Sequence, residues 1–285
     1  MSNIIVTGTN GFLGGAIYKF LSHKHNVYPF GHRQLNLIRE GLDFDKKHII
    51  KNIKPETLIN FGWGGSSDSK YLNNIEQFDN IKTCIDLFNF AVEVGVKTFI
   101  QISSSWRYTH RYGINNYGLC KGWTDNILAR MASLNNIKIL TIVPYWIYGP
   151  NDKKNRFIPK IINSCLKNEK IELHPAQNLV DYLYVSDFCE AAQTILEKGN
   201  NFEIYNICSG NGYKIQDIVE KIKFLTDSKS KINFNLDYPP GFNIEWIGDN
   251  SNLRNLGWEQ KINIIDGLKE TIEYEKTKIS NNFRF

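Results

Sequence analysis

Residues 4–14 read IIVTGTNGFLG, a short apolar run that stops at a glycine and continues with two more glycines at steps of three. This pattern is typical of a buried first strand that turns into a helix beneath a dinucleotide. Gly8 would permit the tight turn, Gly11 would let the backbone approach a pyrophosphate, and Gly14 would let the helix pack close to the strand. The pyrophosphate would face the helix N-terminus, where free N–H groups and the helix dipole favour negative charge.

The glycine spacing is G-x-x-G-x-x-G rather than the commoner G-x-G-x-x-G. A plain strand-to-helix turn is the alternative interpretation of such a segment taken alone. The helix-period pattern of residues 16–21 follows directly, and this favours the dinucleotide-binding interpretation.

The composition is that of an ordinary globular protein, with 42% hydrophobic and 22% charged residues among 285. That length can bury one large core or two modest ones. The formal net charge of +5 arises from scattered basic residues without a dense block. This argues against nucleic acid as a partner and suits an anionic small molecule. No apolar run approaches about 18 residues, so we expect no membrane partner.

The five cysteines are widely spaced and include no C-x-x-C pair, and the six histidines lack ligand spacing. We therefore expect neither a disulfide framework nor a metal site. The first strand begins at residue 3, which leaves no room for a signal peptide. Together these features predict a cytoplasmic protein.

The first half of the chain alternates strand-like and helix-like segments. Strand candidates are 3–7, 26–30, 57–61, 97–103 and 138–143, and helical patterns fill 12–23, 43–53, 71–94 and 116–135. This alternation predicts an α/β fold with βαβ units and a doubly wound parallel sheet of the Rossmann type.

After residue 150 the pattern changes. Strands are expected near 171–174 and 203–207, helices at 215–225 and 264–276, and a frayed tail over 280–285. We expect a dinucleotide-binding domain over 1–150, with the sheet rejoined near 180–208, and a smaller C-terminal substrate domain over 151–285.

Tyr117 and Lys121 stand four residues apart in a helical pattern, so both project from one face. An ammonium beside a phenol favours the phenolate and lowers the phenol pKa from its ordinary value of about 10. Such a tyrosine can exchange a proton with a carbonyl or alcohol oxygen near neutral pH. A tyrosine and a lysine at this spacing form a surface pair far more often, but here they follow a series of βα elements and a dinucleotide-type turn.

Three consecutive hydroxyls, at residues 103–105, end an apolar strand upstream. A hydroxyl there can hold a substrate oxygen beside Tyr117, whereas local bonds to the backbone are the alternative. The second strand is followed by Gly31-His32-Arg33, a basic pair without the carboxylate that usually holds the ribose of NAD. The hypothesis is that the cofactor is NADP(H), with NAD(H) as the alternative.

Several motifs, in order along nearly the whole chain, resemble the extended short-chain dehydrogenase/reductase family, the nucleotide-sugar epimerase, dehydratase and reductase group. The matching segments are Thr7–Gly14 (TGxxGFxG), Asn80–Thr83 (N-x-x-T), Tyr117–Lys121 (Y-x-x-x-K), Tyr148–Pro150 (YGP), Asp181–Asp187 (D-y-i-y-V-x-D) and Leu256–Trp258 (LGW).

The resemblance implies that Tyr117 is the acid/base, that Lys121 bonds the nicotinamide ribose, and that Ser104 or Ser105 orients the reacting oxygen. Asn36 replaces the usual aspartate near the adenine, and Tyr145 would lie behind the nicotinamide. The implied cofactor contacts are Thr7, Gly8, Asn10, Gly11, Phe12, Leu13, Gly14, His32, Arg33, Asn36, Leu37, Phe61, Gly62, Tyr117, Lys121 and Tyr145. The implied substrate contacts are Ser104, Tyr108, Arg156 and Phe157.

Departures from the family pattern narrow the function. The Asp-Glu or Asp-Lys pair of the 4,6-dehydratases is replaced by residues among Ser105, Trp106 and Arg107. The short loop before Tyr117, the basic pair after strand two and the segment 155–159 resemble the CDP-abequose synthase type of 4-ketoreductase. The arginine that usually precedes the Asp181 motif is replaced by valine, and segment 239–243 lacks the arginine that many members use on the diphosphate. Arg156, Lys153 or Lys154 are candidates to replace it.

The sequence therefore predicts an NADPH-dependent 4-ketoreductase that acts on a nucleotide-linked 4-keto-(6-deoxy)hexose in surface-polysaccharide sugar biosynthesis. An NAD-dependent nucleotide-sugar 4-epimerase and a non-catalytic dinucleotide-sensing regulator are the alternatives. The family resemblance also implies a homodimer, in which helices 71–94 and 116–135 pair with their copies.

Overall fold

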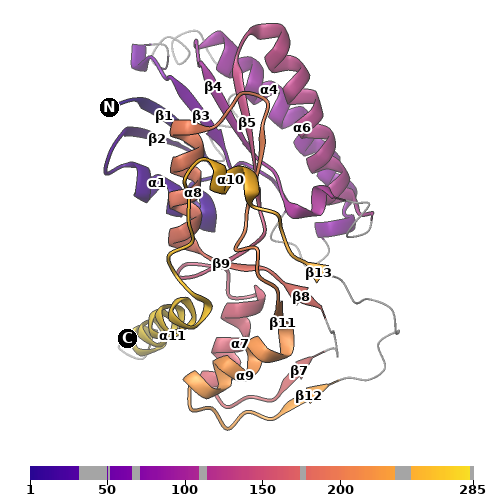
Figure 1. Cartoon of the computed structure of the whole chain (residues 1–285), viewed down its shortest axis with the longest axis vertical. Helices are drawn as coiled ribbons and strands as arrows, with labels where there is room; N and C mark the ends of the chain where they lie inside the picture. The colour runs from indigo at the N-terminus through magenta and orange to yellow at the C-terminus, as the bar shows by residue number, and fades with distance from the viewer. Residues whose placement is uncertain are drawn as a thin grey trace. The chain divides into compact units, whose positions relative to one another are not determined.

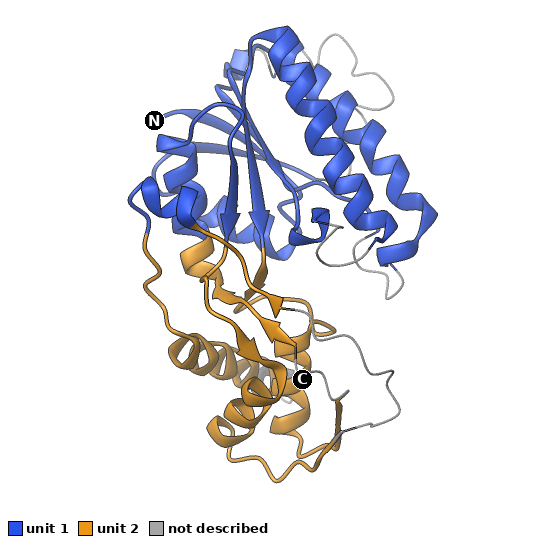
Figure 2. Cartoon of the chain, turned by 45° about the vertical axis from the view of Figure 1, so that its right-hand side comes forward, with its two compact units in different colours: residues 1–144, 189–207, 251–258 blue, residues 145–188, 208–250, 259–285 orange. Residues whose placement is uncertain are grey.

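The computed structural model describes residues 1–31, 50, 52–65, 71–108, 114–173, 178–234 and 245–282. The chain divides into two compact units, drawn in different colours in Figure 2. Unit 1 comprises residues 1–144, 189–207 and 251–258, and unit 2 comprises residues 145–188, 208–250 and 259–285.

Unit 1 is built on a six-stranded sheet in which every neighbouring pair is parallel. Its order is β10-β5-β4-β3-β1-β2. The strands are β1 (Asn3–Thr7), β2 (Asn26–Phe30), β3 (Thr57–Asn60), β4 (Thr98–Ile102), β5 (Lys138–Pro144) and β10 (Ile204–Ile207). The apolar side chains of the central strands β1, β3 and β4 are buried, as in a sheet that is covered on both faces. The predicted α/β fold with a parallel sheet is confirmed.

Helices cover both faces of this sheet (Figure 1). The helices α4 (Asp79–Glu93) and α6 (Asn116–Asn135) run side by side and bury Phe88 and Leu128 in a core with Phe99 of β4. The opposite face carries α1 (Phe12–Leu21) and the unit 1 part of α8 (Val185–Lys198), and Lys24, in the turn after α1, donates to Gln193 of α8 at 3.3 Å. The short helix α10 (Ser251–Asn255) contacts β10.

Unit 2 is smaller, and its described residues form short strands, three complete helices and the start of α8. Its helices are α7 (Phe157–Leu166), α9 (Ile215–Leu225) and α11 (Ile264–Asn282). Its strands are β6 (Trp146–Tyr148), β7 (Ile171–Leu173), β8 (Leu179–Val180), β9 (Tyr182–Tyr184), β11 (Tyr213–Lys214), β12 (Ile232–Phe234) and β13 (Glu245–Trp246). The pairings are β6 with β9, β7 with β12, and β8 with β11 and β13. A core of tyrosines and aliphatic side chains joins these elements.

Two expected helices differ from the structure. The segment 71–94 is not one helix, because two 3-10 turns, η1 (Tyr71–Asn73) and η2 (Ile75–Phe78), precede α4. The side chain of Asn74 accepts a hydrogen bond from the Glu76 N–H. This N-cap begins the separate turn η2 before α4. The helix expected over 264–276 continues to Asn282, so the segment 280–282 is helical rather than frayed. Most of the helix expected at 43–53 lies outside the described residues.

Within the described residues, no helix is long and apolar enough to cross a membrane. The same part of the chain holds no group of three His, Cys, Asp or Glu side chains placed to bind a metal. All five cysteines are free and buried.

Candidate active site

The turn between β1 and α1 requires glycine at two points. Gly8 has a left-handed φ of +67°, and its N–H donates to the carbonyl of Phe30 at 3.0 Å. A Cβ on Gly14 would lie 2.3 Å from the Gly8 carbonyl oxygen, so only glycine lets α1 begin this close to the strand. These contacts agree with the turn and packing roles predicted for the two glycines.

The N-terminus of α1 is open to an anion. Gly11 is its N-cap, no side chain makes a capping bond there, and the first turn holds no acidic residue. A helix N-terminus of this kind presents free N–H groups and a positive dipole end. A Cβ on Gly11 would lie 3.2 Å from the Gly8 carbonyl oxygen, so glycine suits the tight turn that leads into this N-terminus. The residues present therefore fit the diphosphate of a dinucleotide.

A buried polar layer crosses the carboxyl ends of three strands. The Thr7 hydroxyl donates to Asn60 Oδ1 at 2.7 Å, and Asn60 Nδ2 donates to Gln101 Oε1 at 2.9 Å. The N–H of Gly62 donates to the Thr7 hydroxyl at 2.8 Å, which fixes the backbone that follows β3. Asn60 and Gln101 are site residues that the sequence reasoning missed. Their signal was a polar residue near the end of each of two apolar strands, paired in register.

Lys121 lies at the centre of the site and is only 4% exposed. Its Nζ donates to the carbonyl of Ile102, at the end of β4, at 2.9 Å. The ammonium lies 3.7 Å from the centroid of the Trp63 ring and 5.7 Å from that of Tyr117. A cation over an aromatic face is stabilised by the ring quadrupole. The structure thus places the Tyr117 ring beside a buried, firmly held ammonium.

Aromatic rings position the Tyr117 side chain. The ring of Trp63 meets it edge-on at 6.0 Å between centroids, and the ring of Tyr71 does so at 5.1 Å. Trp63 is itself held by a 2.7 Å bond from its indole N–H to the buried Gln77 of η2. Edge-to-face pairs at these distances are favourable and directional. The half-buried Tyr117 is therefore held in a defined orientation.

Burial lowers the pKa of Lys121 to about 8, while nearby Cys84 and Asp125 oppose this change. Burial also raises the pKa of the Cys84 thiol to about 11, so the thiol is neutral at pH 7. Lys121 therefore remains mostly protonated at neutral pH but titrates just above it.

The two candidate serines follow β4. Ser104 is the N-cap of the 3-10 turn η3 (Ser105–Arg107). Its hydroxyl accepts a hydrogen bond from the Trp106 N–H at 3.4 Å. Ser105 is 4% exposed. The Tyr108 hydroxyl donates to Asn206 of β10 at 2.8 Å, which ties the end of this turn to the edge of the sheet.

Three predicted site residues belong to unit 2. Tyr145 is buried, and a Cβ on Gly248 would lie 2.8 Å from its ring, so glycine permits this contact. Arg156 is exposed at the N-cap of α7. Phe157 begins α7 and stacks on Tyr182 with 6.5 Å between ring centroids.

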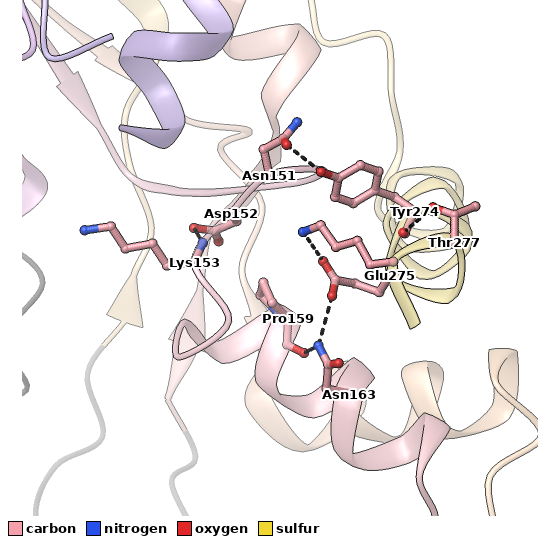
Figure 3. A network of polar contacts seen from close by, with 9 residues as sticks. Asn151, Asp152, Lys153, Pro159, Asn163, Tyr274, Glu275 and Thr277 are labelled. Carbon is pink, nitrogen blue, oxygen red and sulfur yellow. Dashed lines mark hydrogen bonds and ion pairs between the residues drawn. The ribbon is translucent and has the colours of Figure 1, made fainter. Parts of the chain in front are cut away.

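The loop before α7 and the helix α7 itself are connected to α11 by polar contacts (Figure 3). The Tyr274 hydroxyl donates to the Asn151 side chain, and Asn163 Nδ2 donates to the buried Glu275 at 3.0 Å. Burial raises the pKa of Asp152 in this loop to about 6. Lys153 extends away from the network in the figure.

Four predicted cofactor contacts, His32, Arg33, Asn36 and Leu37, lie outside the described residues. The preference for NADP(H) over NAD(H) is therefore an inference from the sequence of residues 32 and 33.

Comparison with known proteins identifies the family. The model of the NAD dependent epimerase/dehydratase family matches residues 4–208. The chain belongs to this family. The match includes β1, the glycine turn, Tyr117, Lys121 and the unit 2 segment that carries Arg156. The predicted resemblance to extended short-chain dehydrogenases/reductases is thereby confirmed.

Relatives within this family differ in size. A trifunctional UDP-glucose 4,6-dehydratase/UDP-4-keto-6-deoxy-D-glucose 3,5-epimerase/UDP-4-keto-L-rhamnose-reductase of Arabidopsis thaliana is 23% identical over 95% of this chain, but the chain spans only 47% of that protein. The CDP-abequose synthase of Yersinia pseudotuberculosis is 24% identical, with 79% of this chain and 85% of the synthase covered.

Among solved structures, RMD from Pseudomonas aeruginosa complexed with NADPH is similar with a TM-score of 0.82. The two chains are 18% identical, and the comparison covers 98% of this chain and all of that one. This similarity supports the fold.

Proposed function

We propose that the chain is an NADPH-dependent 4-ketoreductase of a nucleotide-linked 4-keto-(6-deoxy)hexose, acting in surface-polysaccharide sugar biosynthesis in the cytoplasm. The observation that carries the proposal is the buried Lys121 ammonium. It is held by the Ile102 carbonyl and the Trp63 ring beside the ring of Tyr117. A surface pair would show neither this burial nor these partners.

In this proposal each residue has one task. Tyr117 donates its hydroxyl proton to the carbonyl oxygen of the substrate as that oxygen becomes an alcohol. Lys121 places a positive charge beside the phenol, which favours its ionised form, and it would donate to the ribose of a bound dinucleotide. Ser104 or Ser105 holds the reacting oxygen in line with Tyr117. A bound dinucleotide would supply the hydride to the carbonyl carbon.

Reduction is favoured over dehydration by the residues after Ser104. The turn η3 contains Ser105, Trp106 and Arg107, and none of these is a carboxylic acid. Arg107 also forms an ion pair with Asp125 at 2.9 Å, so it is already engaged. Removal of water across C5 and C6 of the sugar would lack an acid and a base at this position.

The family and its relatives support the proposed substrate class. The relatives named above act on nucleotide-linked sugars by name, and the name of the Arabidopsis protein includes a UDP-4-keto-L-rhamnose-reductase. Arg156 and Phe157, at the start of α7, and Tyr108 remain proposed substrate contacts. The preference for NADPH rests on His32 and Arg33.

The test is to measure oxidation of NADPH and NADH by the purified protein with a panel of nucleotide-linked 4-keto-6-deoxyhexoses. We expect turnover with a KM for NADPH at least about tenfold below that for NADH. A preference of that size for NADH would contradict the cofactor assignment.

The family description also includes epimerases, and an epimerase would keep its cofactor. Stoichiometric, non-exchanging NAD in the absorbance spectrum of the purified protein would favour the 4-epimerase. Binding of a dinucleotide without turnover of any keto-sugar would favour a regulator.

A further inference from the structure

Asp125 lies one helical turn beyond Lys121 on the buried face of α6 and is 3% exposed. Its Oδ2 accepts the Ser103 hydroxyl at 2.5 Å and pairs with Arg107 Nε at 2.9 Å. One carboxylate oxygen therefore joins three segments, namely α6, the end of β4 and the turn η3. The Arg107 side chain is also mostly buried, at 10% exposure.

The same turn is packed tightly on α6. A Cβ on Gly118 would lie 2.3 Å from the Trp106 carbonyl oxygen, so the backbone of η3 touches the helix directly. Within the turn, the Arg107 N–H donates to the Ser104 carbonyl at 3.0 Å, and the Tyr108 N–H donates to the Ser105 carbonyl at 3.2 Å. These two bonds make the turn a compact unit, and a shift of that unit along α6 would break both its backbone contact with Gly118 and the ion pair of Arg107 with Asp125.

A buried ion pair is a poor choice for stability alone. Taking both charges out of water costs several kcal/mol, and apolar side chains of similar size are often as stable or more so. The second oxygen of Asp125, Oδ1, is buried and has no hydrogen-bond partner among the residues that the structure describes, which adds to this cost. A directional ion pair at this point, however, fixes one geometry where an apolar contact would allow several.

We propose that Asp125 is a positioning residue that acts through Arg107 and Ser103. It holds the turn carrying Ser104 and Ser105 in register with the face of α6 that carries Tyr117 and Lys121. This inference rests on the proposed function, because it assigns the ion pair a task in that reaction. A displacement of about 1 Å between reacting groups can reduce a rate by about a hundredfold.

Asp125 also acts on the charge of Lys121. The titratable side chains near the Lys121 ammonium are Cys84 of α4 and Tyr117 and Asp125 of α6. The carboxylate favours the protonated lysine, against the effect of burial. Removing the carboxylate should therefore lower the pKa of Lys121 and move the alkaline fall in activity to lower pH.

The experiment compares Asp125→Asn and Arg107→Met with wild type, Arg107→Lys as the conservative change and Asp86→Asn as the control. Asp86 forms an i,i+4 pair with the exposed Lys82 on α4, so its variant removes an ion pair without touching the turn. For each protein the measurements are kcat, KM for NADPH, the pH profile, and hydrogen exchange of amides 103–108.

We expect both disruptive variants to remain folded, with kcat at least about tenfold lower and KM for NADPH within about threefold of wild type. Hydrogen exchange of amides 103–108 should be faster in Asp125→Asn and Arg107→Met. In Asp125→Asn alone, the alkaline fall in activity should also move to lower pH. Arg107→Lys recovers most of kcat, and Asp86→Asn behaves as wild type.

Wild-type kcat and unchanged exchange in the two variants would overturn the proposal. If Asp125→Asn does not fold, Arg107→Met and Arg107→Lys decide it by the same readouts. If the wild-type protein reduces no keto-sugar, the proposed function fails instead. In that case unchanged exchange over 103–108 overturns the positioning role, and faster exchange supports the role in holding the turn.

Discussion

Lys121 carries its charge where burial disfavours it. The Ile102 carbonyl and the Trp63 ring compensate only in part, since the pKa of Lys121 still falls to about 8. A group whose folded pKa is lowered loses its proton as the pH rises through that value. The charged form is therefore complete well below pH 8 and is lost above it.

This predicts a pH profile in which the reduction rate is level near neutral pH and falls as the pH rises through about 8. The reason is that deprotonation of Lys121 removes the positive charge that lies beside the Tyr117 ring in the proposed reaction. Steady-state kcat with saturating NADPH and keto-sugar, measured from about pH 6 to 10, gives the profile. Lys121→Met removes the titrating group, so its residual activity should lack this fall. A profile shared by wild type and Lys121→Met would show that another group is responsible.

At the scale of elements, two glycines of α6 lie opposite η3 and differ in how much space surrounds them. A Cβ on Gly118 would lie 2.3 Å from the Trp106 carbonyl oxygen, whereas a Cβ on Gly122 would lie 3.7 Å from the nearest atom, the Arg107 carbonyl oxygen. The first position forbids a side chain and the second accepts one.

Gly118→Ala should therefore destabilise the protein by about 1–3 kcal/mol, because the turn must move away from the helix. Gly122→Ala, one helical turn further, should be neutral or stabilising by about 0.5–1 kcal/mol, since alanine is the better helix former. Urea unfolding of both variants tests the pair. Equal free energies of unfolding would contradict the close contact.

The sequence predicted those elements whose cause is local. The strands at 3–7 and 26–30 and the helix at 116–135 have the expected bounds, because apolar runs and helical periodicity lie within each segment. The segment 71–94 was predicted wrongly as one helix. The competing bond from Asn74, a single side chain, was not visible in the periodicity.

The candidate site divides in the same way. The spacing of Tyr117 and Lys121 is local, so it indicated their common face. The ion pair of Arg107 with Asp125 and the bond of Asn60 to Gln101 join residues 18 and 41 positions apart. Such pairs depend on how strands and helices are placed, and no pattern within either segment predicts them.

At the scale of the whole molecule, we propose a homodimer built on α4 and α6. Three exposed or half-buried apolar side chains gather near these helices. Ile75 is 73% exposed, Trp123 is 48% exposed, and the Phe78 ring lies 5.9 Å from that of Trp123. Exposed aromatic and aliphatic groups of this kind mark interaction surfaces.

Trp123→Glu should convert the dimer into a monomer, because it places a charge in the centre of the proposed interface. Phe202→Glu is the control, since Phe202 is also an aromatic residue of unit 1, is 50% exposed, and belongs to neither α4 nor α6. Light scattering after size-exclusion chromatography gives the mass of each. A wild-type monomer, or a Trp123→Glu dimer, would remove this proposal.

The central claim is that the Tyr117 phenol, beside the Lys121 ammonium, exchanges the proton in a nicotinamide-dependent reduction. The most direct measurement compares wild type with Tyr117→Phe for NADPH oxidation by a nucleotide-linked 4-keto-6-deoxyhexose, with the dissociation constant for NADPH measured in parallel. We predict that Tyr117→Phe keeps the melting temperature of wild type and binds NADPH with a dissociation constant within about threefold of wild type. Its kcat should fall at least about a hundredfold. A variant that retains full kcat would contradict the account.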